Sequence, residues 1–166
     1  MTRRDREYWS ADRRFGLTIS AAEVQKLVGF CNGAGKNETG GILVGFYSAN
    51  HDCAIITDLC GPPSDSQFGR TWFRRGVRGL QRWLRQLWPR RRFYLGEWHF
   101  HPCSHAVPSQ VDCDQLNEIA SSEKYHCPEP ILLLIGGTPP SDWEMAVYVF
   151  PREQACVPLE ERKPYM

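Results

Sequence analysis

The chain has 166 residues, 42% of them hydrophobic and 23% charged, and its formal net charge is +1. This composition is ordinary for a globular domain and excludes disordered, collagen-like and low-complexity classes. The longest strongly apolar run, Ile131–Ile135, is far shorter than the roughly 20 residues of a membrane helix, and no apolar stretch follows the N-terminal arginines as it would in a secretory signal. We therefore expect a cytoplasmic protein with no membrane partner.

The length supports a single hydrophobic core. We expect one domain over residues 15–150, a polar arm at residues 1–14 and a peripheral tail at residues 151–166. The chain also contains seven cysteines. Because this number is odd and no two are spaced as C-x-x-C, neither a disulfide framework nor a four-cysteine zinc site is expected.

The N-terminal part of the domain predicts a strand, a helix and a β-hairpin. Phe15–Ile19 is typical of a short strand, and Ser20–Glu23 has the pattern of a capping box that starts a helix ending near Cys31. After a glycine-rich break, Gly41–Tyr47 predicts a buried strand and Cys53–Leu59 predicts its hairpin partner.

A longer helix is predicted over Arg70–Leu87, where apolar residues recur at spacings of four and three. They are Phe73, Val77, Leu80, Leu84 and Leu87. Residues 70–92 also contain nine arginines and no acidic residue, so the rest of the chain is net negative. This stretch is either a solvated helix face or a docking surface, and for the latter we expect an acidic protein partner rather than nucleic acid.

The C-terminal part predicts a strand at Phe93–Phe100, a helix over residues 109–121, and strands at Ile131–Ile135 and Trp143–Phe150. Helices thus alternate with strands that include hairpin pairs. This order is typical of an α+β fold in which a mixed β-sheet is flanked by helices.

A metal-binding pattern lies between the predicted strand and the helix that follows it. His99 and His101 are two residues apart, so in a strand both imidazoles lie on one face. Ser109-x-x-Asp112 predicts a helix start with Asp112 in its first turn. Two imidazoles and one carboxylate, with a fourth position open to water, are the ligands of a catalytic zinc ion, although other first-row ions accept the same donors.

A metal-bound water needs a base, and a nearby carboxylate can take its proton and pass it to a leaving amine. Glu38 is one candidate, because it precedes a strand at a glycine-rich break. Glu97 is the other, because it shares the strand face of the histidines, although we expect it mainly to pair with a basic residue. The spacing alone does not choose between them.

Two cysteines, Cys103 and Cys113, flank the predicted metal ligands, and the sequence does not assign them a role. Cys103 could act as a nucleophile only with a base of its own, for which His105 or His126 would have to serve. We regard this as the weaker alternative, since the histidine and aspartate pattern already supplies a complete site.

Taken together, His99-x-His101, Ser109-x-x-Asp112 and the upstream Glu38 resemble the JAMM motif of the MPN/JAB metalloprotease family. The resemblance implies an MPN/JAB-like, cytidine-deaminase-like fold with one zinc ion on His99, His101 and Asp112. It implies that Glu38 is the general base and acid and that Ser109 stabilises the oxyanion. The implied reaction is hydrolysis of isopeptide or related peptide bonds after the C-terminal tail of a ubiquitin-like protein.

Further segments, among them Tyr94–Pro102 and Cys127–Gly137, are similar to the JAMM isopeptidases of bacterial anti-phage CBASS operons, the third CD-NTase-associated proteins. That subgroup is expected to detach a cGAS-like nucleotidyltransferase from target amines by cutting after its C-terminal residue. Two alternatives stay open. One is a JAMM peptidase that processes another ubiquitin-like or sulfur-carrier protein, and the other is a non-catalytic MPN scaffold or an Arg-rich nucleic-acid-binding module.

Overall fold

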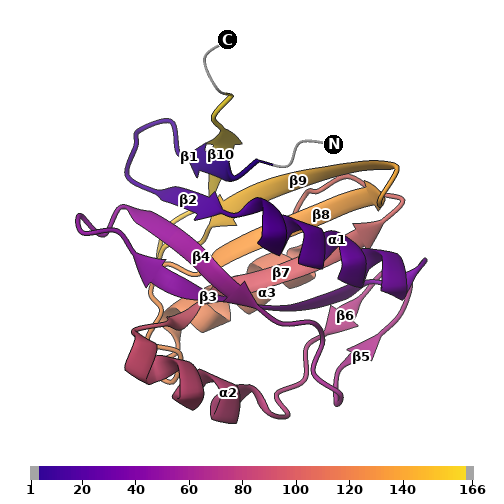
Figure 1. The fold of residues 1–166 in the computed structure, drawn as a ribbon, viewed down its shortest axis with the longest axis horizontal. Coiled ribbons are helices and arrows are strands. Elements are labelled where there is room, and N and C mark those ends of the chain that lie inside the picture. The colour runs from indigo at the N-terminus through magenta and orange to yellow at the C-terminus, as the bar shows by residue number, and fades with distance from the viewer. Residues whose placement is uncertain (1–3, 164–166) are drawn as a thin grey trace.

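The computed structural model describes residues 4–163 and is shown in Figure 1. Most of the predicted elements are present, with boundaries that differ by a few residues. In chain order the elements are β1 Arg6–Trp9, β2 Gly16–Ile19, α1 Ala21–Ala34, β3 Thr39–Tyr47, β4 Cys53–Leu59, β5 Gln67–Phe68, β6 Phe73–Arg74, α2 Leu80–Leu87, a 3-10 turn at Trp88–Arg90, β7 Phe93–Pro102, α3 Gln110–Ser121, β8 Ile131–Thr138, β9 Asp142–Val149 and β10 Val157–Glu161.

The main sheet has the strand order β1-β10-β9-β8-β7-β3-β4-β2 and closes on itself, because β1 also pairs with β2. It is mixed: β2 runs parallel to β4 and β7 parallel to β8, whereas the other pairs are antiparallel. A separate two-stranded hairpin is formed by β5 and β6. The α+β class and the mixed sheet flanked by helices are confirmed.

The larger core lies on the face of the sheet that α1 covers. Val24 and Leu27 of this helix pack with Leu43, Trp98 and Leu133 from three neighbouring strands, and all five are buried. A serine cap begins α1, since the Ser20 hydroxyl accepts a hydrogen bond from the Glu23 amide. The helix continues past its predicted end to Ala34.

The opposite face of the sheet carries α2 and α3. Leu87 of α2 packs against Ile42, and Leu116 of α3 packs against Leu132. Because successive side chains of a strand point to opposite faces, this second face receives the residues that alternate with the first core. The histidines of β7 alternate with Trp98 in the same way and therefore lie on the side of α2 and α3.

The prediction of a helix over Arg70–Leu87 is wrong in its first half: only Leu80–Leu87 is helical. Residues 70–79 form β6 and a loop held by a distant carboxylate, since Asp65 accepts hydrogen bonds from the amides of Val77 and Arg78. Phe73 is buried while Val77 is 66% exposed, so the apolar stripe is not one face of a helix. These tertiary contacts override the sequence periodicity.

The predicted arm and tail each contain a strand of the closed sheet. Tyr8 of β1 and Leu159 of β10 are buried in the main core, while most of their neighbours are partly or fully exposed. Such short strands with one buried side chain give little periodic signal in sequence. Residues 1–3 of the arm and 164–166 of the tail lie outside the described part of the chain.

Candidate active site

Two histidines of β7 and one aspartate of α3 are in direct contact. His99 Nδ1 lies 2.7 Å from Asp112 Oδ1, and His101 Nε2 lies 3.2 Å from Asp112 Oδ2. All three residues are buried, with exposed fractions of 2%, 7% and 5%. One carboxylate therefore joins both imidazoles on the same face of the strand, as the spacing of two residues requires.

The position of Asp112 is set by the first turn of α3. Its Oδ2 accepts a hydrogen bond of 2.8 Å from the Ser109 amide, and its own amide donates one of 3.1 Å to Ser109 Oγ. These two bonds form a capping box and confirm the predicted helix start at Ser109. Burial opposes ionisation of Asp112, but hydrogen bonds from His101 and His99 outweigh it and hold the pKa of this carboxyl well below its usual range.

Ser109 reaches the surface beside this aspartate. The residue is exposed, and its hydroxyl oxygen acts as an acceptor in the cap. A hydroxyl that accepts one hydrogen bond keeps its own O–H for donation. Ser109 can therefore cap α3 and donate to a ligand at the same time.

Glu38 lies immediately before β3, at the end of the sheet that holds the histidines. In the β3–β7 ladder Gly40 faces His99 and Thr39 faces Phe100, so the chain direction brings Glu38 towards His101. Burial raises the pKa of the Glu38 carboxyl, and the charges of His101 and Asp112 also act on it. Its backbone amide donates a 2.9 Å hydrogen bond to the Gly69 carbonyl.

The other carboxylate candidate is already paired. Glu97 is 3% exposed and forms an ion pair of 2.8 Å with the Arg75 guanidinium. It also accepts a hydrogen bond from the Tyr94 hydroxyl. The expectation that Glu97 pairs with a basic residue is confirmed. The sequence did not identify Arg75 as its partner, because residues 70–79 were wrongly predicted to be helical. Phe73, from the same segment, places its ring edge-on at 5.6 Å from the His99 imidazole.

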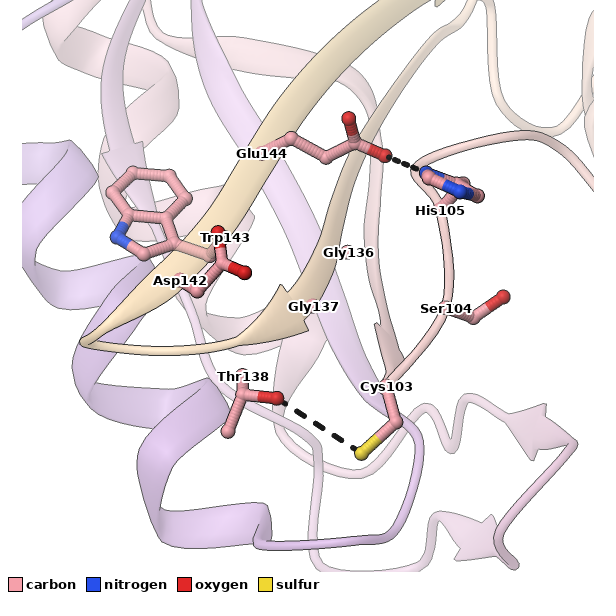
Figure 2. A pocket seen from close by; sticks show the side chains of 9 residues that line it. All are labelled: Cys103, Ser104, His105, Gly136, Gly137, Thr138, Asp142, Trp143 and Glu144. Carbon is pink, nitrogen blue, oxygen red and sulfur yellow. Dashed lines mark hydrogen bonds and ion pairs between the residues drawn. The ribbon is translucent and has the colours of Figure 1, made fainter.

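The cysteine alternative gains no support from the structure. Cys103 and His105 line a cavity of about 380 Å³. Figure 2 shows that Cys103 faces Thr138 and that His105 faces Glu144. Cys103 Sγ lies 4.0 Å from Thr138 Oγ1, and His105 Nδ1 lies 3.1 Å from Glu144 Oε1. His126 lines a different cavity, beside Trp88. Cys113 is partly exposed on α3, and all seven cysteines are free thiols, so the prediction of no disulfide framework agrees with the structure.

The donor atoms of His99, His101 and Asp112 fit a zinc ion by type, since zinc prefers imidazole nitrogen and carboxylate oxygen in open catalytic sites. In this structure the two imidazole nitrogens contact the carboxylate oxygens directly, at 2.7 Å and 3.2 Å. Within residues 4–163 no group of three or more histidine, cysteine or acidic side chains is placed so that it could hold a metal ion as it stands. A bound ion would take the place of the contacts between these imidazoles and the carboxylate.

Comparison with known proteins adds independent information. A model of prokaryotic homologs of the JAB domain matches residues 20–148, which include all five predicted site residues. A curated protein of Enterobacter hormaechei subsp. hoffmannii (strain UCI 50), named CD-NTase/cGAS isopeptidase, is 38% identical over 161 residues, covering 97% of this chain and 89% of that protein.

The fold is also similar to a solved structure. The solution structure of protein DSY2949 from Desulfitobacterium hafniense superimposes with a TM-score of 0.61 over 86% of each chain at 16% sequence identity. At this identity the likeness concerns the fold alone. In the part of the chain that the structure describes, no helix is both long and apolar enough to cross a membrane.

Proposed function

Because the chain belongs to the prokaryotic JAB-domain family, we propose that it is a zinc-dependent isopeptidase whose site is formed by Glu38, His99, His101, Ser109 and Asp112. The observation that carries the proposal is the contact of one buried carboxylate with both imidazoles at the start of α3. The JAB-domain match spans this whole constellation. A single Zn²⁺ per chain is the expected cofactor.

We infer the substrate class from the similarity to the protein named CD-NTase/cGAS isopeptidase, which extends over 97% of this chain. The substrate would be a cGAS-like nucleotidyltransferase joined through its C-terminus to a target amine in the bacterial cytoplasm. Removing it by hydrolysis after its last residue would reverse the conjugation step of CBASS anti-phage defence.

The chemistry divides among the side chains of the site. His99, His101 and Asp112 would hold Zn²⁺, which when bound supplies Lewis acidity that polarises a carbonyl and lowers the pKa of water. The Glu38 carboxylate accepts a proton from the attacking water and delivers it to the leaving lysine amine, while the carbonyl carbon gains the water oxygen and loses the nitrogen. A carboxyl whose pKa is raised by burial is better matched to both transfers.

Ser109 acts in the same hydrolysis step as Glu38, but on the carbonyl oxygen of the substrate. Its O–H donates to the carbonyl oxygen as negative charge develops there, which favours the transition state over the substrate. Its place at the start of α3 adds the positive end of the helix dipole. The helix cap and the oxyanion contact are thus two uses of one hydroxyl.

An extended substrate tail has a place beside Glu38. A cavity of about 400 Å³ lies between α1 and the β5–β6 hairpin, and Phe30, Phe68 and Glu38 are among its lining residues. Its walls are largely apolar side chains and glycine, which suit a tail with little bulk. We propose that the tail runs along this groove and pairs as an added strand with the β5–β6 hairpin, whose sheet is open whereas the main sheet is closed.

The exposed arginines of residues 70–92 form a second contact area. Arg74, Arg78 and Arg82 are exposed on β6, the following loop and α2, and Arg74 also lines the cavity beside His99. We propose that they dock an acidic surface of the conjugate. Charge complementarity of this kind mainly speeds association and selects the partner.

The test is cleavage of a model conjugate, in which a nucleotidyltransferase C-terminal tail is linked through its last residue to a reporter protein. Wild-type protein and Glu38→Gln are compared with and without a zinc chelator. We expect chelator-sensitive, Glu38-dependent cleavage after the last residue of the tail. Cutting of linear fusions but not of lysine-linked conjugates would instead support the processing peptidase, and an absence of cleavage with one zinc bound per chain would contradict the nucleotidyltransferase as substrate.

A further inference from the structure

The connection between β4 and α2 touches the site at three points. The Gly69 carbonyl accepts a hydrogen bond from the Glu38 amide. The Phe73 ring lies edge-on against the His99 imidazole, with an interplanar angle of 75°. Arg75 pairs with Glu97, two residues before His99 on β7. A single segment, residues 61–79, therefore contacts the proposed base and one proposed metal ligand.

Arg75 is the strongest of these attachments. Its Nε lies 2.8 Å from Glu97 Oε2, its Nη2 donates at 2.9 Å to Glu97 Oε1 and also to the Tyr125 hydroxyl, and its Nη1 donates to the Gly76 carbonyl. The exposed fractions of the two charged side chains are 11% and 3%. Bidentate geometry and burial make this pair more directional than a surface ion pair.

A backbone irregularity completes the network. Strand β7 shifts register beside Gly96, which has a φ of +156° and packs where a Cβ would lie 2.0 Å from the Ile131 carbonyl oxygen. The shift places Tyr94 on the same face as Glu97, although the two are three residues apart, and its hydroxyl donates to Glu97 at 2.8 Å. Glu97 is therefore held by Tyr94 from within β7 and by Arg75 from the connecting segment.

The rings of Phe73 and His99 share the space above a glycine. A Cβ at Gly40 would lie 2.7 Å from Phe73 Cε1 and 2.8 Å from His99 Cδ2. The imidazole is thus confined by the Phe73 ring on one side and by its hydrogen bond to Asp112 at Nδ1. The position of the Phe73 ring depends on the contacts that hold residues 61–79 in place. Arg75, which pairs with Glu97, is two residues after Phe73.

We propose that Arg75 is a positioning residue, because its ion pair with Glu97 attaches residues 61–79 to β7. This attachment keeps the Phe73 ring in contact with the His99 imidazole and keeps the Gly69 carbonyl hydrogen-bonded to the Glu38 amide. The expected change in kcat rests on the proposed function, whereas the expected change in the position of the His99 imidazole does not. Residues that orient metal ligands from outside commonly change metal affinity or activity by about 10- to 100-fold when substituted.

The experiment compares Arg75→Met and Arg75→Lys with Phe73→Leu, which removes the ring but leaves the ion pair. Arg14→Met is the matched control, because Arg14 also pairs with a carboxylate, Asp12 at 2.7 Å, but on the surface. Three readouts are taken on folded protein: the ring resonances of His99 in metal-free protein, Zn²⁺ affinity by competition with a chromophoric chelator, and kcat and KM on the model conjugate.

For Arg75→Met we expect His99 ring resonances displaced as in Phe73→Leu, Zn²⁺ affinity and kcat each lowered about 10- to 100-fold, and KM within about twofold of wild type. Arg75→Lys keeps the charge but cannot form the bidentate pair, so it should fall between wild type and Arg75→Met; it carries the test if Arg75→Met does not fold. Arg14→Met should match wild type in all three readouts.

A merely structural role for Arg75 would lower the melting temperature and leave these three quantities unchanged in the folded fraction, and that result would overturn the proposal. Wild-type His99 resonances in Arg75→Met would overturn it as well. If the wild-type protein fails to cleave the conjugate, the proposed function fails, yet the His99 resonances and Zn²⁺ affinity still decide whether Arg75 positions the imidazole.

Discussion

Residues 97–112 and residues 61–79 form two walls of one site, but different kinds of contact organise them. In the first wall the decisive relations are local: two histidines alternate along β7, and a serine and an aspartate three residues apart cap α3. In the second wall they are long-range, since Arg75 binds Glu97 at a distance of 22 residues along the chain and Tyr125 at 50. The proposed metal ligands and Ser109 thus lie in the locally determined wall, Glu38 lies outside both walls, and residues that contact His99 and Glu38 lie in the other wall.

The largest effect is expected at Glu38, the proposed base, whose backbone amide is bonded to the second wall at Gly69. Glu38→Gln keeps the side-chain volume but removes the base, so kcat on the model conjugate should fall by about 10²- to 10⁴-fold. Zinc content should stay at one per chain and the melting temperature near that of wild type. Metal analysis and steady-state kinetics on the same sample check this, and wild-type turnover would remove Glu38 from the mechanism.

The role of Ser109 in residues 97–112 can be probed by comparing it with Ser20, the other serine that caps a helix. Ser109 and Ser20 each accept a hydrogen bond from the amide three residues ahead, at 3.1 Å and 3.2 Å. Replacing either serine with alanine should cost about 1 kcal/mol in the free energy of unfolding. Only Ser109→Ala should also lower kcat, by about 10²- to 10³-fold, because only that hydroxyl is proposed to donate to the developing oxyanion.

Urea unfolding and turnover of the two serine variants separate capping from catalysis. Equal kcat values for Ser109→Ala and Ser20→Ala would show that the Ser109 hydroxyl acts in the cap alone.

The two walls meet above Gly40, where the Trp98 carbonyl oxygen and the rings of Phe73 and His99 leave no room for a methyl group. Gly40→Ala should destabilise the fold by about 1–3 kcal/mol, as overpacking does, and lower kcat through displacement of the imidazole. Gly33→Ala is the stability control, since nothing lies within 4 Å of a Cβ at that helical position. It should leave the protein as stable as wild type or up to about 1 kcal/mol more stable.

Denaturant unfolding gives both free energies. A Gly40→Ala protein with wild-type stability and wild-type kcat would mean that the two rings are not held together in solution.

The smallest effect is expected on the outer surface of the long-range wall. Reversing Arg74, Arg78 and Arg82 to glutamate should raise KM about tenfold at low salt, and the difference should shrink as salt screens the charges. The same change of net charge at Arg13, Arg14 and Lys163, which are exposed elsewhere on the protein, should leave KM unchanged. Kinetics across a salt series test this, and an equal KM in both triple variants would argue against docking through these arginines.

Most of the sheet and two of the three helices follow from patterns that extend over neighbouring residues. Alternation and apolar runs are dense in β3, β7 and β8, which are buried on both faces, and serine caps mark the starts of α1 and α3. The same reasoning failed at residues 70–79, where arginines between apolar residues imitate a helix. There Asp65 supplies the acceptors for two backbone amides that a helix would have satisfied internally.

The sequence also failed to predict β1 and β10, the strands that close the sheet. Tyr8 and Leu159 are the buried side chains through which β1 and β10 join the main core, and one apolar residue in a short segment predicts nothing by itself. Their pairing is between opposite ends of the chain, for example Tyr8 with Glu161. Only the folded sheet brings these segments together.

The amino-acid sequence was therefore sufficient to predict the α+β class and the candidate residues His99, His101, Ser109 and Asp112, because periodicity, capping and motif spacing are relations between near neighbours. Glu38 is far from them along the chain, and only the resemblance to the JAMM motif favoured it over Glu97 as the base. The closure of the barrel, the pairing of Arg75 with Glu97 and the packing of Phe73 on His99 were decided by tertiary structure. Each joins groups far apart along the chain, and their contacts become favourable only once the sheet has brought them together and excluded water from between them.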